Sequence, residues 1–267
     1  MFIREKKIKC GSNYQEVDII PRTIEAERNR LGHRIKRKRV SLPKQKNLND
    51  KNAKRYLLQL VNGNFDNRDL HVSLTYSDEF LPKTIEDAKK EVTNYLRRLA
   101  ARRKKLGLEP LKYIVITEGT RDKNDGYLKR VHHHIIMNGG IDRDEVEDVW
   151  SKKKKTMGWV NARKIQTNEN GAEALAIYLT KDPQGKKRWS SSRNLTRPVE
   201  LEPNDSRYSK RKIEKMAMSN DLGREIFERE FKDFYIADVR SVYYELTGWH
   251  IYLKMWRKEK ADANQRI

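Results

Sequence analysis

Short segments in the middle of the chain alternate apolar and polar residues, the pattern of β-strands that bury one face. We expect four such strands, at residues 70–76, 111–117, 131–137 and 158–165. A polar loop at 119–130 is all that separates the second strand from the third. These two strands are therefore expected to be neighbours in one sheet.

Apolar residues at helical spacing occur between these strands and predict helices. The longest helix is expected to begin at Thr84, with Asp87 in the position of a capping box, and to end in a basic run at 97–105. Residues 142–150 and 169–181 predict two more helices. The order β-α-β-β-α-β-α predicts an α+β fold, a central antiparallel sheet with helices packed on one face.

The two flanks show weaker patterns. Residues 3–20 predict a hairpin, 210–234 are helical in pattern, and two aromatic runs within 239–256 predict a second hairpin. The basic segment 33–55 is interpreted as a surface segment that stays flexible until it meets phosphate, with a simple solvated loop as the alternative. We divide the chain into residues 1–65, a central domain at 66–200, and residues 201–267, which are expected to pack on that domain.

Charge narrows the class of partner. The formal net charge is +21, from 59 Lys plus Arg against 38 Asp plus Glu, and a basic surface gains by releasing counterions from phosphates. A charge excess that only aids solubility is the alternative. The single cysteine, Cys10, excludes an internal disulfide and a zinc cluster of several cysteines. The start, MFIREKKIKC, lacks the apolar core of a signal peptide, and no apolar run approaches a membrane span, so we expect a soluble, intracellular protein.

Three of the six histidines stand together, as His132-His133-His134, within the predicted strand at 131–137. Alternation places His132 and His134 on one face, where they form a natural pair of metal ligands, and His133 on the other, in the core. We choose Glu118, at the end of the neighbouring strand, as the third ligand. Imidazole with carboxylate suits Mg²⁺ or Mn²⁺ better than a structural zinc. The alternatives are a polar strand without metal and an exposed carboxylate at a strand end.

A tyrosine lies in the last predicted helix. Tyr178 is at the edge of its apolar stripe, and Lys181 is one turn further on the same flank. A phenol is a poor nucleophile at neutral pH unless a cation or metal stabilises the phenolate, which Lys181 can do. A tyrosine that only packs at the edge of the core is the alternative.

These residues resemble the motifs of HUH endonucleases, specifically the single-tyrosine rolling-circle replication initiators of small single-stranded DNA phages and related mobile elements. The resemblance rests on LHVSLTY at 70–76, RVHHHIIM at 130–137 and YLTK at 178–181, and it spans roughly residues 66–200. RWSSSRNL at 188–195 also resembles the segment after the tyrosine helix in phage-type members. One position departs, because His133 stands where the family usually has a bulky hydrophobic residue, so a shifted choice of ligands stays open.

The resemblance implies an enzyme that nicks and rejoins single-stranded origin DNA. A divalent metal on His132, His134 and Glu118 would orient the scissile phosphate, and Tyr178 would attack phosphorus to give a 5′-phosphotyrosine and a free 3′-hydroxyl. Lys181 would stabilise the charge that develops. Candidates for holding the DNA strand, with ordinary surface or core packing as the alternative, are Arg130, Trp189, Arg193 and Asn194.

A partner helicase is expected, because the chain has no G-x-x-x-x-G-K-[ST] phosphate loop. The resemblance implies that this partner belongs to a bacterial host, with the protein in its cytoplasm. Two other functions fit the residues: a single-tyrosine HUH transposase or relaxase, and a non-catalytic nucleic-acid-binding protein whose histidines are structural. Metal-dependent covalent trapping on DNA separates the enzyme from the non-catalytic protein.

Overall fold

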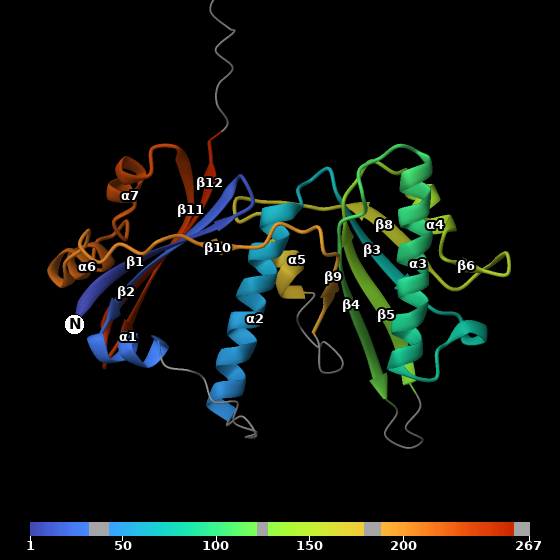
Figure 1. Ribbon diagram of the computed structural model, residues 1–267, viewed down its shortest axis with the longest axis horizontal. Coiled ribbons are helices and arrows are strands. Elements are labelled where there is room, and N and C mark those ends of the chain that lie inside the picture. The colour runs from blue at the N-terminus through green and yellow to red at the C-terminus, as the bar shows by residue number, and fades with distance from the viewer. Residues whose placement is uncertain (32–42, 122–127, 179–187, 259–267) are drawn as a thin grey trace, which may run out of the picture. The chain divides into compact units, whose positions relative to one another are not determined.

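The computed structural model describes residues 1–31, 43–121, 128–178 and 188–258 (Figure 1). Its contacts divide the chain into two compact units. The central unit is Asn64–Leu195, and the terminal unit joins Met1–Gly63 to Thr196–Ile267. Both chain ends therefore belong to one unit.

The central unit is built on a five-stranded sheet in which every neighbouring pair is antiparallel. The strand order is β8-β3-β5-β4-β9. In that order the strands are β8 (Val160–Lys164), β3 (Leu70–Thr75), β5 (Leu128–Met137), β4 (Tyr113–Arg121) and β9 (Ser190–Ser191). An antiparallel sheet combined with helices confirms the predicted α+β fold.

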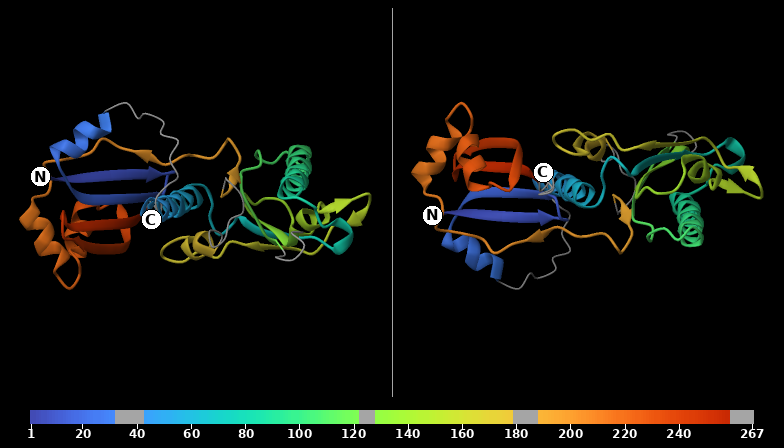
Figure 2. Two further views of the ribbon diagram at one scale, coloured as in Figure 1. Left: turned by 90° about the horizontal axis from the view of Figure 1, so that it is seen from below. Right: turned by 90° about the horizontal axis from the view of Figure 1, so that it is seen from above.

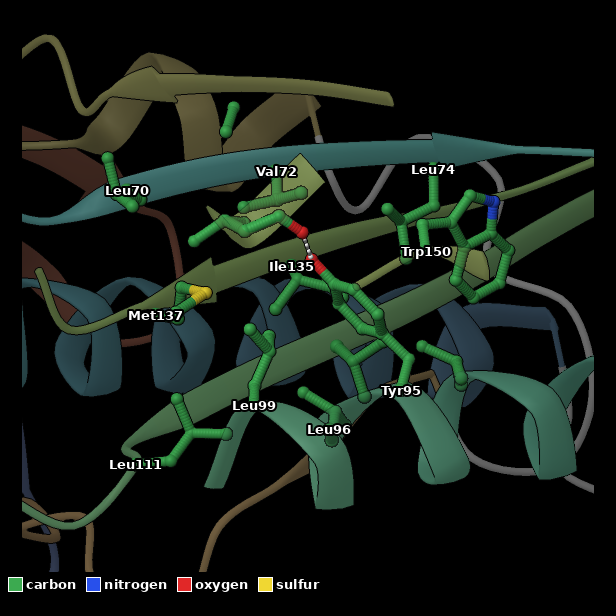
Figure 3. Packing of buried hydrophobic residues seen from close by; sticks show 14 of the residues in the cluster. Leu70, Val72, Leu74, Tyr95, Leu96, Leu99, Leu111, Ile135, Met137 and Trp150 are labelled. Atoms are coloured by element: carbon green, nitrogen blue, oxygen red, sulfur yellow. Dashed lines mark hydrogen bonds between the residues drawn. The ribbon is translucent and has the colours of Figure 1, made fainter. Parts of the chain in front are cut away.

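Helix α3 (Ile85–Lys105) packs on one face of this sheet, where Tyr95, Leu96 and Leu99 point toward the strands (Figure 3). The Thr84 hydroxyl accepts a hydrogen bond from the Asp87 backbone N–H, so the predicted cap is confirmed. The buried aromatic side chains satisfy their polar atoms. Tyr95 donates to the carbonyl of Val146, in α4 (Arg143–Asp148), at 2.9 Å, and the Trp150 indole donates to the carbonyl of Thr75 at 2.8 Å.

Three cations in the basic run at the end of α3 have structural partners. Arg103 is buried, and its guanidinium donates to the carbonyls of Asn138 and Gly139 at 3.1 and 2.7 Å. Arg102 pairs with Glu145, and Arg98 donates to a backbone carbonyl of the loop after α4. These contacts engage cations that the sequence alone could equally have assigned to a phosphate backbone.

The structure corrects several boundaries in the central unit. Strands β4 and β5 reach Arg121 and Leu128, so the predicted loop at 119–130 is shorter, and residues 122–127 lie outside the described part. Helix α5 (Glu173–Tyr178) begins later than predicted, because Asn168 and Gly171 close a turn before it. Short elements that the sequence did not indicate are η1 (Asp78–Phe80) and the hairpin of β6 (Ser151–Lys152) with β7 (Lys155–Thr156).

The terminal unit also contains a five-stranded antiparallel sheet, in the order β10-β1-β2-β12-β11. Figure 2 shows the first two strands beside the last two. Both predicted hairpins are confirmed. The strands are β1 (Phe2–Cys10), β2 (Tyr14–Arg22), β10 (Val199–Glu200), β11 (Phe234–Tyr244) and β12 (Gly248–Arg257), and the helices are α1 (Ile24–Leu31), α2 (Pro43–Asn64), α6 (Lys210–Ala217) and α7 (Arg224–Glu230).

The basic segment at 33–55 is corrected in part. Residues 43–55 belong to helix α2, whose later residues Leu57, Leu60 and Val61 are buried, and residues 32–42 lie outside the described part. The segment was interpreted as flexible because its own residues carry almost no apolar positions. The helix gains its packing from residues beyond 55. Within the described residues, no helix combines the length and apolar character that crossing a bilayer requires.

Candidate metal centre and nucleophile

The register of β4 and β5 brings Glu118 and His132 opposite each other. Glu118 Oε2 lies 3.1 Å from His132 Nε2, and both side chains are half-buried. His134 is two residues further along β5, on the same face, and is buried. One ligand atom from each of the three residues lies within 4.8 Å of the other two, which is the spacing a shared metal ion requires.

A backbone irregularity orients the His132 ring. The β4–β5 register shifts between Glu118 and Thr120, and Arg130 has a left-handed φ of 53°. The Arg130 carbonyl lies 2.8 Å from His132 Nδ1. If Nδ1 carries the proton and donates to this carbonyl, Nε2 keeps its lone pair facing Glu118, the arrangement by which proteins fix a metal-binding imidazole.

His134 fits the same role. Its Nδ1 lies 3.2 Å from both His71 Nε2 and Ser73 Oγ on the adjacent strand β3. Its Nε2 is buried and has no hydrogen-bond partner among the described residues. Burial, with a smaller contribution from the neighbouring imidazoles, lowers the pKa of His134 to about 3, so the ring is neutral at pH 7. A buried polar atom without a partner is costly, and a metal ion on Nε2 would satisfy it.

His71 and Ser73 are residues whose contact with the site was missed in the sequence. Burial lowers the pKa of His71 to about 4, so it too is neutral and able to accept a proton-bearing contact from His134. The alternation of β3, with Leu70, Val72 and Leu74 buried on the other face, assigns His71 and Ser73 to one face. It does not reveal that His134 lies opposite Ser73, which depends on the pairing of β3 with β5.

His133 confirms the strand parity, because it points to the opposite face and is fully buried. Its Nε2 lies 2.8 Å from the Tyr76 hydroxyl, and its Nδ1 lies 2.9 Å from the Thr117 hydroxyl. Burial, the largest cause, lowers the pKa of His133 to about 3. Both ring nitrogens are therefore engaged in the core, away from Glu118.

Tyr178 ends α5 on the metal-facing side of the sheet. Its ring centroid lies 5.4 Å from that of His134, with the two planes at 78°. The side chain is 56% exposed, so its hydroxyl is accessible to a large substrate. Lys181 lies outside the described residues. The structure thus brings together Glu118, His132, His134 and Tyr178.

The DNA-binding candidates are spread along β4. The antiparallel register pairs Ser190 with Val115, so half-buried Trp189 continues toward the Glu118 end of β4. Asn194 lies at the other end of β4, where its amide donates to the Leu111 carbonyl at 3.3 Å. Arg193, which precedes it, is exposed, as is Arg130. By this register, Trp189 is nearer to the triad than Asn194.

An antiparallel sheet that carries one carboxylate, two neutral imidazoles and an adjacent phenol on one face defines a class of protein able to combine a divalent metal with a tyrosine. Residues 69–183 match a family model, that of the replication-associated proteins of the ORF2 and gene 2 protein type. The matched segment is less than half of the 267 residues, and it contains the triad and Tyr178. No curated protein and no solved structure matches the chain. The family match supports a role in initiating DNA replication, with DNA as partner.

Proposed function

We propose that this protein is a replication initiator that nicks and rejoins single-stranded origin DNA through a covalent tyrosine intermediate. The observation that carries the proposal is the placement of Tyr178 against His134, whose buried Nε2 has no partner among the described residues. A nucleophile beside an unsatisfied ligand atom is the arrangement of a reactive site. The match to a replication-associated family supplies the biological setting.

Glu118 and the Nε2 atoms of His132 and His134 would hold a divalent metal. One carboxylate with two imidazoles is compatible with Mn²⁺ or Mg²⁺. When bound, such an ion polarises the scissile phosphate and orients it. The chain's own contribution is to keep both imidazoles neutral and turned toward Glu118, through the contacts of His132 with Arg130 and of His134 with β3.

The proposed reaction is a transesterification. The Tyr178 oxygen attacks phosphorus, the bond from phosphorus to the 3′-oxygen breaks, and a 5′-phosphotyrosine forms. The phenol loses its proton and the departing 3′-oxygen gains one, so the free 3′-hydroxyl can prime synthesis. The phosphodiester energy stays in the covalent link, so the reverse reaction rejoins strands without ATP. Lys181 is proposed to stabilise the phenolate or the phosphate charge, and a host helicase to unwind the duplex.

The test is covalent trapping. Purified protein is mixed with labelled single-stranded oligonucleotides that include the element's own origin, with Mn²⁺ or with EDTA, and is analysed on denaturing gels. Wild type should give a covalent protein–DNA band that requires metal. Tyr178→Phe should lower its yield by more than about 10³-fold, because removing a nucleophile removes the reaction path.

Tyr235→Phe is the matched control, since Tyr235 is 49% exposed in the terminal unit and should trap DNA as wild type does. Glu118→Gln should also abolish the band. A band that persists in Tyr178→Phe would assign the nucleophile to another residue. Binding of origin DNA without any covalent product would favour the non-catalytic nucleic-acid-binding protein.

A further inference from the structure

Trp159 is a large aromatic side chain that the fold holds in solvent. Its side chain is 60% exposed. Its backbone is fixed by Thr75, whose N–H and hydroxyl donate to the Trp159 carbonyl at 2.9 and 3.0 Å, and whose hydroxyl accepts from the Trp159 N–H at 2.9 Å. A Cβ on the preceding Gly158 would lie 2.4 Å from the Thr75 carbonyl oxygen, so this close approach requires glycine. Single exposed apolar residues are common, so the position of Trp159 in the sheet decides whether it has a role.

The register places Trp159 in line with the candidate metal centre. Val160 pairs with Leu74, so Trp159, one residue earlier, lies opposite Thr75. Thr75 pairs with His132, and His132 pairs with Glu118. One row across the sheet therefore runs from Trp159 to Glu118. With strands about 4.8 Å apart, Trp159 begins roughly 10 Å from His132.

The alternation of β8 extends this feature along the edge of the sheet. Ala162 is buried on the α3 side, so Asn161 and Arg163 point to the face that carries the metal centre. Continuing the alternation by one step assigns Trp159 to the same face. Arg163 is exposed and donates to Asn161 Oδ1 at 3.2 Å. The edge strand thus presents an aromatic ring followed by a cation.

We propose that Trp159 and Arg163 form a binding strip for single-stranded DNA, in which Trp159 stacks on a base beside the scissile phosphate and Arg163 contacts a phosphate. This rests on the proposed function, because it takes the metal centre as the cleavage point. An aromatic platform combined with cations that follow the backbone is how proteins hold single strands without reading their sequence. The strip positions substrate and takes no part in bond making or breaking.

The test measures DNA binding apart from cleavage. Fluorescence anisotropy of a labelled single-stranded mixed-sequence oligonucleotide is recorded in EDTA, in a Tyr178→Phe background. Trp159→Ala should weaken binding by about 5- to 100-fold, the effect of losing one base stack. Trp159→Phe should recover much of the affinity, because a smaller ring can still stack. Tyr235→Ala, at an exposed aromatic of the terminal unit, should bind as the background protein does.

Salt dependence separates the two contacts. Arg163→Ala should reduce the slope of log K against log salt by about 0.7, the value for one neutralised phosphate on a single strand. Trp159→Ala should weaken binding without changing that slope. Thermal unfolding of both variants checks that the sheet edge is intact.

Unchanged affinity in Trp159→Ala, or no recovery in Trp159→Phe with both proteins folded, would overturn the proposal. A covalent band in wild type together with unchanged affinity in Trp159→Ala would overturn this proposal alone. Weakened binding in Trp159→Ala, in a protein that never forms the covalent band, would support the strip and overturn the nuclease.

Discussion

The two units each place a cluster of polar side chains on one face of an antiparallel sheet, and the clusters differ in how their atoms are satisfied. In the terminal unit, Glu16 and Asp18 are buried on β2. Arg55 of α2 contacts both carboxylates at 2.6 Å, Gln59 donates to Glu16 at 2.7 Å, and the Tyr14 hydroxyl donates to Glu16 at 2.9 Å. Each carboxylate has donors from the protein, so the cluster serves to fix α2 to the sheet.

The central unit leaves a different balance. Its triad has one carboxylate and two imidazoles, and the buried Nε2 of His134 is without a partner among the described residues. The groups around the triad instead engage the far sides of the rings, at the Nδ1 atoms. The comparison teaches that burial of polar groups alone does not mark a site. An arrangement that directs unsatisfied atoms toward one point does.

Breaking the satisfied cluster should have the largest effect on stability. Arg55→Met leaves two buried carboxylates without their shared cation, and we expect the free energy of unfolding to fall by about 3 kcal/mol. This lies at the low end for a buried pair because the Arg55 side chain is itself 36% exposed. Urea denaturation followed by circular dichroism measures the change. Mn²⁺ affinity should stay at the wild-type value in the protein that remains folded.

Arg68→Met is the control for that experiment. Arg68 contacts Asp66 at 2.6 Å, but both side chains are largely exposed, at 84% and 47%. A surface ion pair contributes about 0–1 kcal/mol, so this variant should unfold close to wild type. Equal losses in the two variants would contradict the assignment of a buried structural role to Arg55.

Disturbing the unsatisfied cluster should change metal affinity rather than stability. His71→Leu removes the imidazole 3.2 Å from His134 Nδ1, so the His134 ring loses a contact that favours a free Nε2. Losing such an outer contact typically weakens metal binding by about 10- to 100-fold. Titration calorimetry with Mn²⁺ measures the affinity, and long-range ¹H–¹⁵N spectra of the metal-free protein report which His134 nitrogen carries the proton.

The control for His71→Leu is His250→Leu, which removes a histidine of the terminal unit that contacts Thr247 and Tyr252. It should leave Mn²⁺ affinity unchanged. His71→Gln, which keeps an acceptor, should recover part of the affinity. Wild-type affinity and an unchanged His134 tautomer in His71→Leu would show that Ser73 or the backbone alone orients the ring.

The sequence indicated the parts of the site that depend on local geometry. Alternation separates His132 and His134 from His133 in any register, and a short connection makes the strand of Glu118 their neighbour. The cap of α3 was equally predictable, because Thr84 and Asp87 are three residues apart. In each of these cases the residues that interact are close in the chain, so one sequence carries the information.

Contacts between distant segments could not be predicted in this way. His71 and Trp159 join the site through the pairing of β3 with β5 and β8, and alternation within one strand says nothing about which strand lies beside it. The terminal unit depends on β2 pairing with β12, at the opposite end of the chain, so the chain ends were treated as separate parts. Helix α2 was missed because its exposed first half lacks an apolar stripe.

The smallest expected effect separates the backbone of Arg130 from its side chain. A left-handed φ costs a non-glycine residue about 1–2 kcal/mol, while glycine adds roughly 0.5–1 kcal/mol of backbone entropy to be lost on folding. Arg130→Gly should therefore raise the free energy of unfolding by no more than about 1 kcal/mol. Its carbonyl would still face His132, so Mn²⁺ affinity should not change. If the guanidinium holds a phosphate, the salt slope of single-strand binding should fall by about 0.7. A drop in Mn²⁺ affinity, measured by the same calorimetry, would instead show that the side chain maintains the bend that orients His132.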